Sequence, residues 1–348
     1  MLEILSKFQL EGRAVACEPF GSGHINATYL ATTDAGKRYV LQKINDSVFR
    51  DVDGLMNNIR LVTEYLRARG HAALHIVPAA DGRPYTLHCD GSYYRVYDFV
   101  EGICLDQVET PEDFRQSGVA FGEFQRQLAE FPAASLVETI PRFHDTANRF
   151  RIFREALKAD PLGRARDVQP EIEFSLAHEE MASSMLNMLA RGELPLRVTH
   201  NDTKLNNVML RADTRTPLCV IDLDTTMPGL AGNDFGDSIR FGASTAAEDE
   251  QDLDKVEMSL RLFDAYADGF LGACGESLTA AEIETLPLAA MLMTLECGVR
   301  FLTDYLQGDT YFRIHRPGQN VDRCRTQYKL VADMERKRDE MLKLVHRR

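Results

Sequence analysis

The sequence predicts an α+β chain of two lobes, an antiparallel β-rich lobe over residues 1–100 and a helical lobe over residues 101–348. The first observation is the length, because 348 residues exceed what one compact core usually holds. The second is a change of pattern near residue 100. Short β-rich runs separated by glycine-containing turns precede this point, and apolar residues at helical spacing follow it.

Three antiparallel strands are expected first. The runs AVACEPF, ATYLATT and RYVLQKIN form a β-meander, and the turn DAGK joins the second run to the third. Gly21 and Gly23 lie in the segment GSGHIN, between the first two runs. Two glycines at such a turn let backbone N–H groups approach phosphates, although the third glycine of a GxGxxG loop is absent. A Walker loop and a Rossmann turn are excluded, because no GK[ST] follows and the next element is a strand.

Lys43, at the end of the third strand, is a candidate ligand of the α and β phosphates of a nucleotide. The alternative is a solvated strand lysine. Residues 51–67 then carry apolar side chains at the i, i+3, i+4, i+7 spacing of a helix with one packed face. Glu64 on this helix is either a partner for Lys43 or a solvated carboxylate.

The sheet is completed by residues 75–78, 86–89 and 92–100, which are separated by Asp-Gly turns. The helix expected over residues 249–272 begins in the acidic run EDEQD. Negative charge is favourable at a helix N-terminus. From residue 106 onward helices are expected over residues 111–131, 143–159, 171–190, 249–272, 279–306 and 321–345.

The stretch 196–239 interrupts this helical pattern and holds the candidate catalytic groups. His200, Asp202 and Asn207 have the spacing HxDxxxxN of the catalytic loop that protein kinases and small-molecule phosphotransferases share. Phosphoryl transfer needs a carboxylate that accepts the proton of the attacking hydroxyl, and an amide and a second carboxylate that hold Mg²⁺. We therefore assign Asp202 as the base, and Asn207 with Asp222 on the next β-rich run as the metal ligands. The alternative is an ordinary polar turn.

Two further aspartates follow. Asp224 lies two residues beyond Asp222 on a strand-like run, so we expect it to point to the same face and to reach the substrate or a second metal; equally, it could support the metal ligands from behind. The triplet Asp234-Phe235-Gly236 spells the magnesium motif of protein kinases, but it lies too far beyond Asn207. We expect Asp234 to open the next helix or to brace the catalytic loop through backbone N–H groups.

The segments THNDTKLNNVML, CVIDLDTTMPGL and DFGDSIRFGAS resemble those of the N-acetylhexosamine 1-kinases, within the aminoglycoside phosphotransferase and choline kinase superfamily. The resemblance covers nearly the whole chain and implies a two-lobed, protein-kinase-like fold. In that fold the backbone around Asp98 and Val100, between the lobes, would pair with adenine. It also implies ATP and Mg²⁺ as cofactors, and transfer of phosphate to the anomeric (C1) hydroxyl of N-acetylglucosamine or N-acetylgalactosamine.

The same resemblance implies three side chains that contact the sugar. His24 in the glycine turn, Arg300 on an apolar helix and Tyr311 beyond that helix match the sugar-binding positions of the hexosamine kinases. Arg300 needs an acceptor if it is buried, which is either a sugar oxygen or a carboxylate such as Asp304.

Composition limits the partners. The net charge is −13 and the chain has no long basic block, which argues against nucleic acid and anionic membranes as partners. The most apolar run, residues 286–299, contains Pro287, Thr294 and Glu296, so neither a membrane span nor a signal peptide is expected. The seven cysteines lack metal-ligand spacing, as in reduced cytoplasmic proteins. We expect a cytoplasmic monomer or weak dimer.

Two rival functions stay open. The first is a kinase for choline, an amino alcohol or an aminoglycoside; choline recognition favours an aromatic cage, and the chain has no Trp but has 11 Tyr. The second is a nucleotide-binding regulator without activity. Loss of the base or of a metal ligand would mark such a protein, and Asp202, Asn207 and Asp222 are all present.

Overall fold

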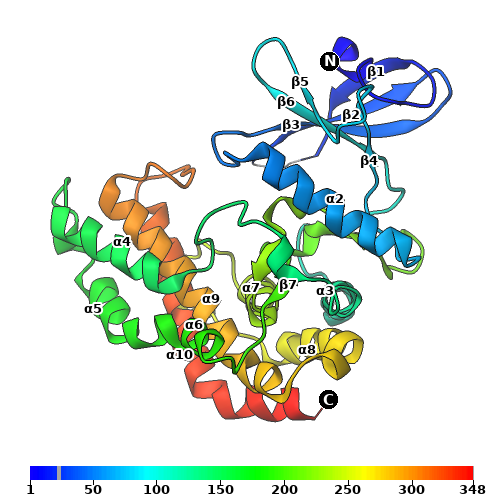
Figure 1. The fold of residues 1–348 in the computed structure, drawn as a ribbon. Helices are drawn as coiled ribbons and strands as arrows, with labels where there is room; N and C mark the ends of the chain where they lie inside the picture. Colours follow the sequence, from blue (N-terminus) through cyan, green and yellow to red (C-terminus); the bar gives the residue numbers. More distant parts are fainter. Residues whose placement is uncertain (22–24, 348) are drawn as a thin grey trace.

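The computed structural model describes residues 1–21 and 25–347, which form two lobes (Figure 1). A β-sheet builds the upper lobe and helices build the lower one, with the N-terminus at the top and the C-terminus at the far end of the lower lobe. The predicted α+β, protein-kinase-like architecture is thereby confirmed.

The upper lobe is one antiparallel sheet of six strands with the order β1-β2-β3-β6-β4, and β5 also pairs with β6. The short helix α1 (Leu2–Leu5) packs on its outer face. The strands are β1 (Ala14–Pro19), β2 (Ala27–Thr33), β3 (Arg38–Ile44), β4 (Ile76–Val77), β5 (Thr86–Leu87) and β6 (Tyr93–Asp98).

Helix α2 (Val52–Ala68) joins the two lobes. Asp51 caps its N-terminus, because the carboxylate accepts a hydrogen bond from the Gly54 N–H at 2.9 Å. The apolar positions that predict this helix are buried, and they share one hydrophobic core with residues of the lower lobe. The helix passes beneath the sheet, between it and the lower lobe (Figure 1). The core is therefore continuous from one lobe into the other.

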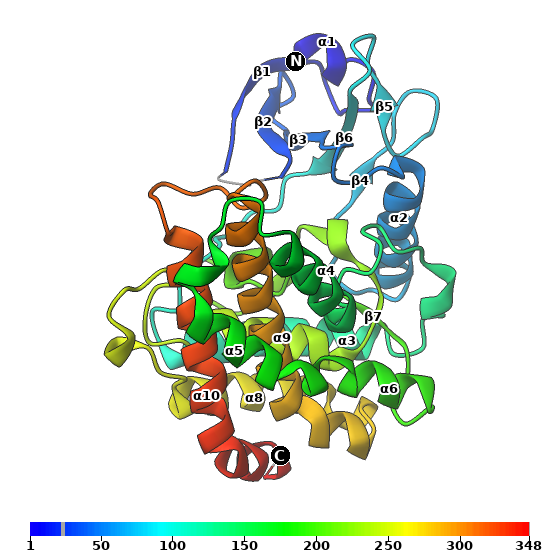
Figure 2. The ribbon, with the colours of Figure 1, turned by 90° about the vertical axis from the view of Figure 1, so that its left-hand side faces the viewer.

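The lower lobe is built from pairs of packed helices: α3 lies on α8, α7 on α9, and α9 on α10 (Figure 2). Two short antiparallel sheets of two strands each also belong to this lobe: β7 pairs with β10, and β8 forms a hairpin with β9. The helices are α3 (Pro111–Gln127), α4 (Thr146–Ala159), α5 (Gln169–Ala177), α6 (Ser184–Ala190), α7 (Ala231–Gly242), α8 (Leu260–Cys274), α9 (Ala280–Gln307) and α10 (Gln319–His346), and the strands are β7 (Arg197–Thr199), β8 (Val208–Leu210), β9 (Pro217–Val220) and β10 (Met227–Gly229).

Two helix predictions were wrong in detail. Residues 171–190 form two helices with a 3₁₀ turn between them, and His178 at the break bonds the Phe174 carbonyl through its own ring at 2.7 Å. The helix expected from residue 249 begins only at Leu260, where the Ser259 hydroxyl caps it. The acidic run before it stays in a loop, because its carboxylates pair with arginines such as Arg240 instead of a helix end.

Helix α9 is, among the residues that the structure describes, the one helix long and apolar enough to cross a membrane by length and composition. Its most apolar window is 89% buried inside the protein. The helix begins with a capping box in which Thr279 and Glu282 bond each other's backbone N–H groups. Its apolar residues therefore build the core of the lower lobe.

Candidate active site

The catalytic loop follows β7 and is held by a buried histidine. The Nε2 atom of His200 donates to the Ile221 carbonyl at 2.9 Å, and its Nδ1 accepts from the Asp202 N–H at 3.3 Å. The ring packs edge-on against Phe121 and Phe124. His200 therefore ties the loop to the segment that carries Asp222, and it has no exposed atom with which to reach a substrate.

Asp202 is held in place by two residues of its own loop. The Lys204 ammonium lies 2.8 Å from one carboxylate oxygen and 3.1 Å from the other. The Asn207 amide donates to the Asp202 carbonyl at 2.8 Å and to its carboxylate at 3.3 Å. The carboxylate keeps 23% of its side-chain surface exposed, so a hydroxyl group can approach it.

The candidate metal ligands are Asn207 and Asp222. The β8–β9 hairpin brings them together, since the Ile221 N–H donates to the Asn207 carbonyl at 2.9 Å. Asp222 adopts a left-handed backbone conformation with φ +58°, and the chain then enters a 3₁₀ turn. Desolvation by the surrounding protein, together with the nearby carboxylates of Asp224 and Asp202, raises the pKa of Asp222 to about 6. The Asp222 side chain nevertheless stays exposed to solvent.

These two side chains fit a hard divalent cation. Within the described ranges, neither the Asn207 amide oxygen nor the Asp222 carboxylate has a hydrogen-bond or ion-pair partner. The described residues also contain no group of three or more His, Cys, Asp and Glu that could hold a metal. Mg²⁺ suits such a site, because it retains waters and takes phosphate oxygens in addition to one or two protein ligands.

Asp224 does not occupy the position expected for it. Residues 223–225 form a 3₁₀ turn, so the strand argument that placed Asp224 on the face of Asp222 was wrong. The carboxylate is buried, and it contacts the Arg95 guanidinium at 2.5 Å and the Asn26 amide at 2.5 Å. Both oxygens contact other residues of the protein, which contradicts a direct contact with substrate or metal. The arrangement fits the alternative, in which Asp224 supports the metal ligands from behind.

Asp234 braces the catalytic loop, as predicted. One carboxylate oxygen accepts from the His200 N–H at 3.0 Å and from the Gln125 amide at 2.7 Å, and the other accepts from the Asn201 N–H at 2.7 Å. The triplet that resembles the kinase magnesium motif lies inside α7, where the Phe235 side chain is fully buried. Burial raises the pKa of Asp234, and the hydrogen bonds partly offset this rise.

The prediction for Lys43 was wrong. In the β3–β6 register Lys43 lies opposite Tyr94, and residues directly opposite each other share a face of the sheet. Tyr94 packs in the outer core with α1, so Lys43 faces away from the lower lobe. Glu64 forms an ion pair with Arg60 at 2.8 Å instead of binding Lys43.

Arg300 and Tyr311 lie near each other, with the guanidinium 5.9 Å from the center of the tyrosine ring. The Tyr311 side chain is exposed, which leaves its hydroxyl free for a ligand. Asp304 is not the partner of Arg300, because its carboxylate accepts the N–H groups of Thr310, Tyr311 and Phe312 at 2.8–2.9 Å. No ion pair to Arg300 occurs among the described residues.

The nucleotide positions are placed in part. Gly21 lies two residues beyond β1 with φ +76°, which suits the expected turn, whereas Gly23 and His24 lie outside the described residues. The Asp98 N–H is already bonded to the His75 carbonyl at 3.1 Å, so Asp98 could pair with adenine only through its own carbonyl. Val100, in contrast, has no hydrogen bond to any residue in the described part of the chain, so its backbone groups are available.

Comparison with known proteins identifies the family. Residues 16–268 match the model of the phosphotransferase enzyme family. The chain belongs to this family. It is accordingly a small-molecule phosphotransferase of the aminoglycoside phosphotransferase and choline kinase type, and its catalytic loop is the one that such enzymes share with protein kinases.

Solved structures share the fold of this phosphotransferase over nearly its full length. A microcompartment-associated aminopropanol kinase is 17% identical, with a TM-score of 0.58 and coverage of 98% of this chain and 97% of that chain. The amicoumacin kinase hAmiN, in complex with AMP-PNP, Ca²⁺ and Ami, is 14% identical, with a TM-score of 0.62 and coverage of 97% and 92%. The Plasmodium vivax ethanolamine kinase is 13% identical, with a TM-score of 0.56 and coverage of 90% and 81%. These identities show the shared fold alone.

The phosphotransferase has further charged residues near the catalytic loop that the sequence did not single out. His144 contacts the Asn201 carbonyl at 3.3 Å and the Glu296 carboxylate at 3.0 Å. Although burial opposes its charged form, Glu296 raises the pKa of His144. Arg149 donates to a backbone carbonyl at 2.7 Å, and its Nε atom has no partner among the described residues. Nothing in the local sequence marks them, because helices α4 and α9 bring them together.

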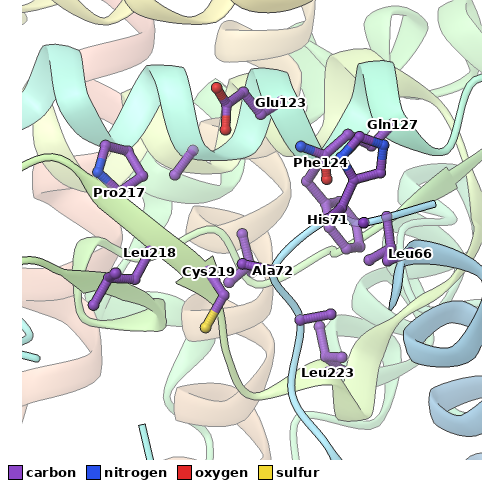
Figure 3. A pocket seen from close by; sticks show the side chains of 14 residues that line it. Leu66, His71, Ala72, Glu123, Phe124, Gln127, Pro217, Leu218, Cys219 and Leu223 are labelled. Atoms are coloured by element: carbon purple, nitrogen blue, oxygen red, sulfur yellow. The ribbon is translucent and has the colours of Figure 1, made fainter. Parts of the chain in front are cut away.

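A cavity of about 180 Å³ lies behind β9, between the end of α2 and α3 (Figure 3). Its walls include Glu123, Gln127 and Cys219, and none of the predicted site residues lines it. Burial raises the pKa of Cys219 to about 11, so its thiol is not a nucleophile at neutral pH. The cavity is therefore separate from the phosphotransferase site.

Proposed function

We propose that this phosphotransferase transfers the γ-phosphate of ATP to the anomeric hydroxyl of N-acetylglucosamine or N-acetylgalactosamine. Residues 1–100 bind the nucleotide and residues 101–348 bind the acceptor and carry the catalytic groups. Val100 offers backbone groups to adenine, and the turn at Gly21 and Gly23 covers the phosphates. The protein acts in the cytoplasm as a monomer or weak dimer.

Asp202 accepts the proton of the attacking hydroxyl in this proposal. An anomeric hydroxyl is more acidic than an ordinary alcohol, so a carboxylate suffices as the base. Lys204 places a positive charge beside this carboxylate, where it would also attract the negatively charged phosphate. Asn207 and Asp222 would hold Mg²⁺, which neutralises phosphate charge when it is bound. Most of the acceleration then comes from positioning and charge neutralisation.

The observation that carries the choice of acceptor is a pair of arginines beside the catalytic loop, Arg149 and Arg300. Neither forms an ion pair in the described part of the chain, although both interact with the charge of Glu296. The Thr146 hydroxyl donates to Glu296 at 2.6 Å, which joins the start of α4 to α9. Arg149 lies one turn further along α4, and Arg300 lies one turn further along α9. The two helices run in the same direction, since Arg164 beyond α4 reaches the Tyr305 carbonyl near the end of α9 at 2.8 Å.

The two guanidinium groups are therefore neighbours. Burial and the charge of Arg300 lower the pKa of Arg149, as expected for two cations that face each other. Such a surface favours an acceptor rich in oxygen atoms and disfavours a cation. Repulsion between these two guanidinium groups and a cationic acceptor argues against choline, ethanolamine or aminopropanol, although kinases of such compounds share the fold.

An acceptor panel tests the proposal. ADP release is measured with N-acetylglucosamine, N-acetylgalactosamine, choline, ethanolamine and an aminoglycoside, and the product is located by ³¹P NMR. We expect turnover of an N-acetylhexosamine with the phosphate on C1. The compound 1-deoxy-N-acetylglucosamine should inhibit competitively, because it keeps the binding contacts and lacks the nucleophile. Phosphorylation of the 1-deoxy sugar, or turnover of the amines alone, would overturn the proposal.

A further inference from the structure

Among the described residues, the strands β3 and β6 place no lysine on the face that meets the lower lobe. Gln42 and Arg95 lie opposite each other in the β3–β6 register and share that face. The Gln42 amide oxygen accepts from Nε of Arg95 at 2.9 Å and from Nη2 at 2.8 Å. The strand thus presents the guanidinium of Arg95, held in one orientation by a neutral neighbour.

Arg95 forms a buried ion pair with the segment that carries the metal ligand. Its Nη1 atom lies 2.5 Å from the Asp224 carboxylate, and the two side chains are 1% and 4% exposed. Arg95 belongs to β6 of the upper lobe, whereas Asp224 follows Asp222 in the lower lobe. The pair therefore connects the lobes at a point two residues from the proposed metal ligand.

Two asparagines of the upper lobe contact the same segment. Asn26, just before β2, donates to the second Asp224 oxygen at 2.5 Å, and it also accepts from the Asn45 N–H at 2.9 Å. Asn58 of α2 donates to the Thr226 carbonyl at 3.0 Å. Residues 222–226 are thus bound by a strand, a loop and a helix of the other lobe.

The segment contains a backbone conformation that is unfavourable for a residue with a side chain. Asp222 needs its left-handed backbone to direct the carboxylate outward, and only glycine adopts such a conformation without cost. A segment held by a charged fork keeps that geometry better than one held by a point charge, because guanidinium hydrogen bonds fix an angle as well as a distance.

We propose that Arg95 is a positioning residue for the metal site: with Gln42 and Asn26 it fixes Asp224, and thereby the direction of the Asp222 carboxylate. This role rests on the proposed function of Asp222 as a metal ligand. The link also explains how a chain whose β3 lysine faces outward can couple the upper lobe to the metal. Arg95 is 1% exposed, so in this proposal it acts through Asp224.

The experiment measures binding of AMP-PNP by calorimetry with Mg²⁺ and with EDTA, which requires no acceptor. Arg95→Lys keeps the charge but loses the fork. Arg95→Met combined with Asp224→Asn removes both charges, and buried pairs replaced by neutral groups often leave a protein folded. The matched control is Arg197→Met with Glu282→Gln, a buried pair with contacts of 2.5 and 2.8 Å that lies away from the metal segment.

We expect both Arg95 variants to raise the Kd of AMP-PNP with Mg²⁺ about tenfold and to leave the Kd in EDTA within about twofold. The control pair should change neither constant. Unchanged Mg²⁺-dependent binding in a folded variant would overturn the proposal, and so would an equal loss with and without Mg²⁺. If both variants fail to fold, Asn26→Ala removes one of the bonds to Asp224 and should show the same pattern at a smaller size.

The proposed metal role is tested separately by Asp222→Asn. If this variant keeps Mg²⁺-dependent binding, the metal assignment itself fails. If it loses that binding while the Arg95 variants keep it, only the positioning role fails.

Discussion

Asp222 and Asp234 lie on consecutive segments of the lower lobe. They differ in how many hydrogen-bond donors the protein supplies to their carboxylates. Three donors of the catalytic loop and α3 bond the buried Asp234 carboxylate. Asp222 has no such partner among the described residues, and desolvation by the surrounding protein, together with nearby carboxylates, raises its pKa to about 6. A carboxylate that the fold saturates serves the fold, whereas one that the fold leaves open at a cost is available for a ligand.

The arginines show the same difference. Arg197 bonds both oxygens of Glu282 and the Ser277 carbonyl, at distances of 2.5 to 2.8 Å. Arg300 has aromatic rings beside it but forms no ion pair with a carboxylate in the described part of the chain. Arginines, like aspartates, thus divide into those whose partners the fold supplies and those left open to a ligand.

The largest effect is expected at the base. Asp202→Asn should lower kcat by about two to four orders of magnitude, because loss of a general base typically costs that much. Binding of Mg·AMP-PNP should stay within a few-fold. Steady-state kinetics and calorimetry check both, with the exposed Asp213→Asn as the control. Activity within a few-fold of the original would remove Asp202 from the role of base.

Asp234→Ala comes next, with an effect on stability. It leaves the His200 and Asn201 N–H groups without acceptors and removes one of the two acceptors of the Gln125 amide, which should cost about 3 kcal/mol of the free energy of unfolding. Urea unfolding measures this loss, and Asp339→Ala, an exposed change on α10, should have no effect. A variant of full stability that had lost only Mg²⁺ binding would show that the saturated aspartate is the functional one.

Arg300→Ala should raise the KM for N-acetylhexosamine about ten- to hundredfold, since a hydrogen bond from a charged donor contributes roughly 1.5 to 3 kcal/mol. Tyr311→Phe should raise it less, roughly two- to tenfold. The KM for ATP should stay within about twofold in both. Arg197→Ala serves as the saturated counterpart: it should reduce stability and leave the KM for sugar unchanged. A raised KM for sugar in Arg197→Ala, together with an unchanged one in Arg300→Ala, would contradict the assignment of Arg300 to the sugar.

The smallest effect is a gain in stability. Folding raises the pKa of Asp222, so the folded state is favoured at pH below about 4 and loses that advantage as the pH rises through about 6. Asp222→Asn removes this penalty. After allowance for solvent screening of this accessible group, we expect a gain of about 1 kcal/mol for the ligand-free protein at pH 8 and none at pH 4. Chemical unfolding at the two pH values measures it; a loss of stability at pH 8 would contradict it.

The parts of the site that the sequence revealed are those encoded in short spacings. Asp202, Asn207 and Asp222 fall within one stretch. The structure brings the carboxylates of Asp202 and Asp222 close enough for their charges to interact, and the Asn207 amide bonds Asp202. Asp234 could be set apart from the magnesium role by its distance along the chain alone. The lobes followed from a change of periodicity, which side-chain burial imposes along the whole chain.

The parts that were missed depend on packing between distant segments. A shift of one residue in a strand moves a side chain to the other face, and this separates Lys43 from Gln42. Arg95 gave no signal, because a strand arginine is ordinarily solvated and its partner Asp224 lies in the other lobe. Arg149 and His144 were missed for the same reason, since α4 and α9 are far apart in sequence.

The most direct test of the contrast between the two aspartates is thermal unfolding with AMP-PNP, with and without Mg²⁺. A ligand at a hundredfold excess over its Kd stabilises the folded state by about 2.7 kcal/mol. If Asp222 holds the metal, Asp222→Asn should lose the Mg²⁺-dependent part of this stabilisation, while the ligand-free protein should melt no earlier than the original. Asp234→Asn should melt earlier and keep that part. The reverse result, with Mg²⁺-dependent stabilisation lost in Asp234→Asn alone, would contradict the metal role of Asp222.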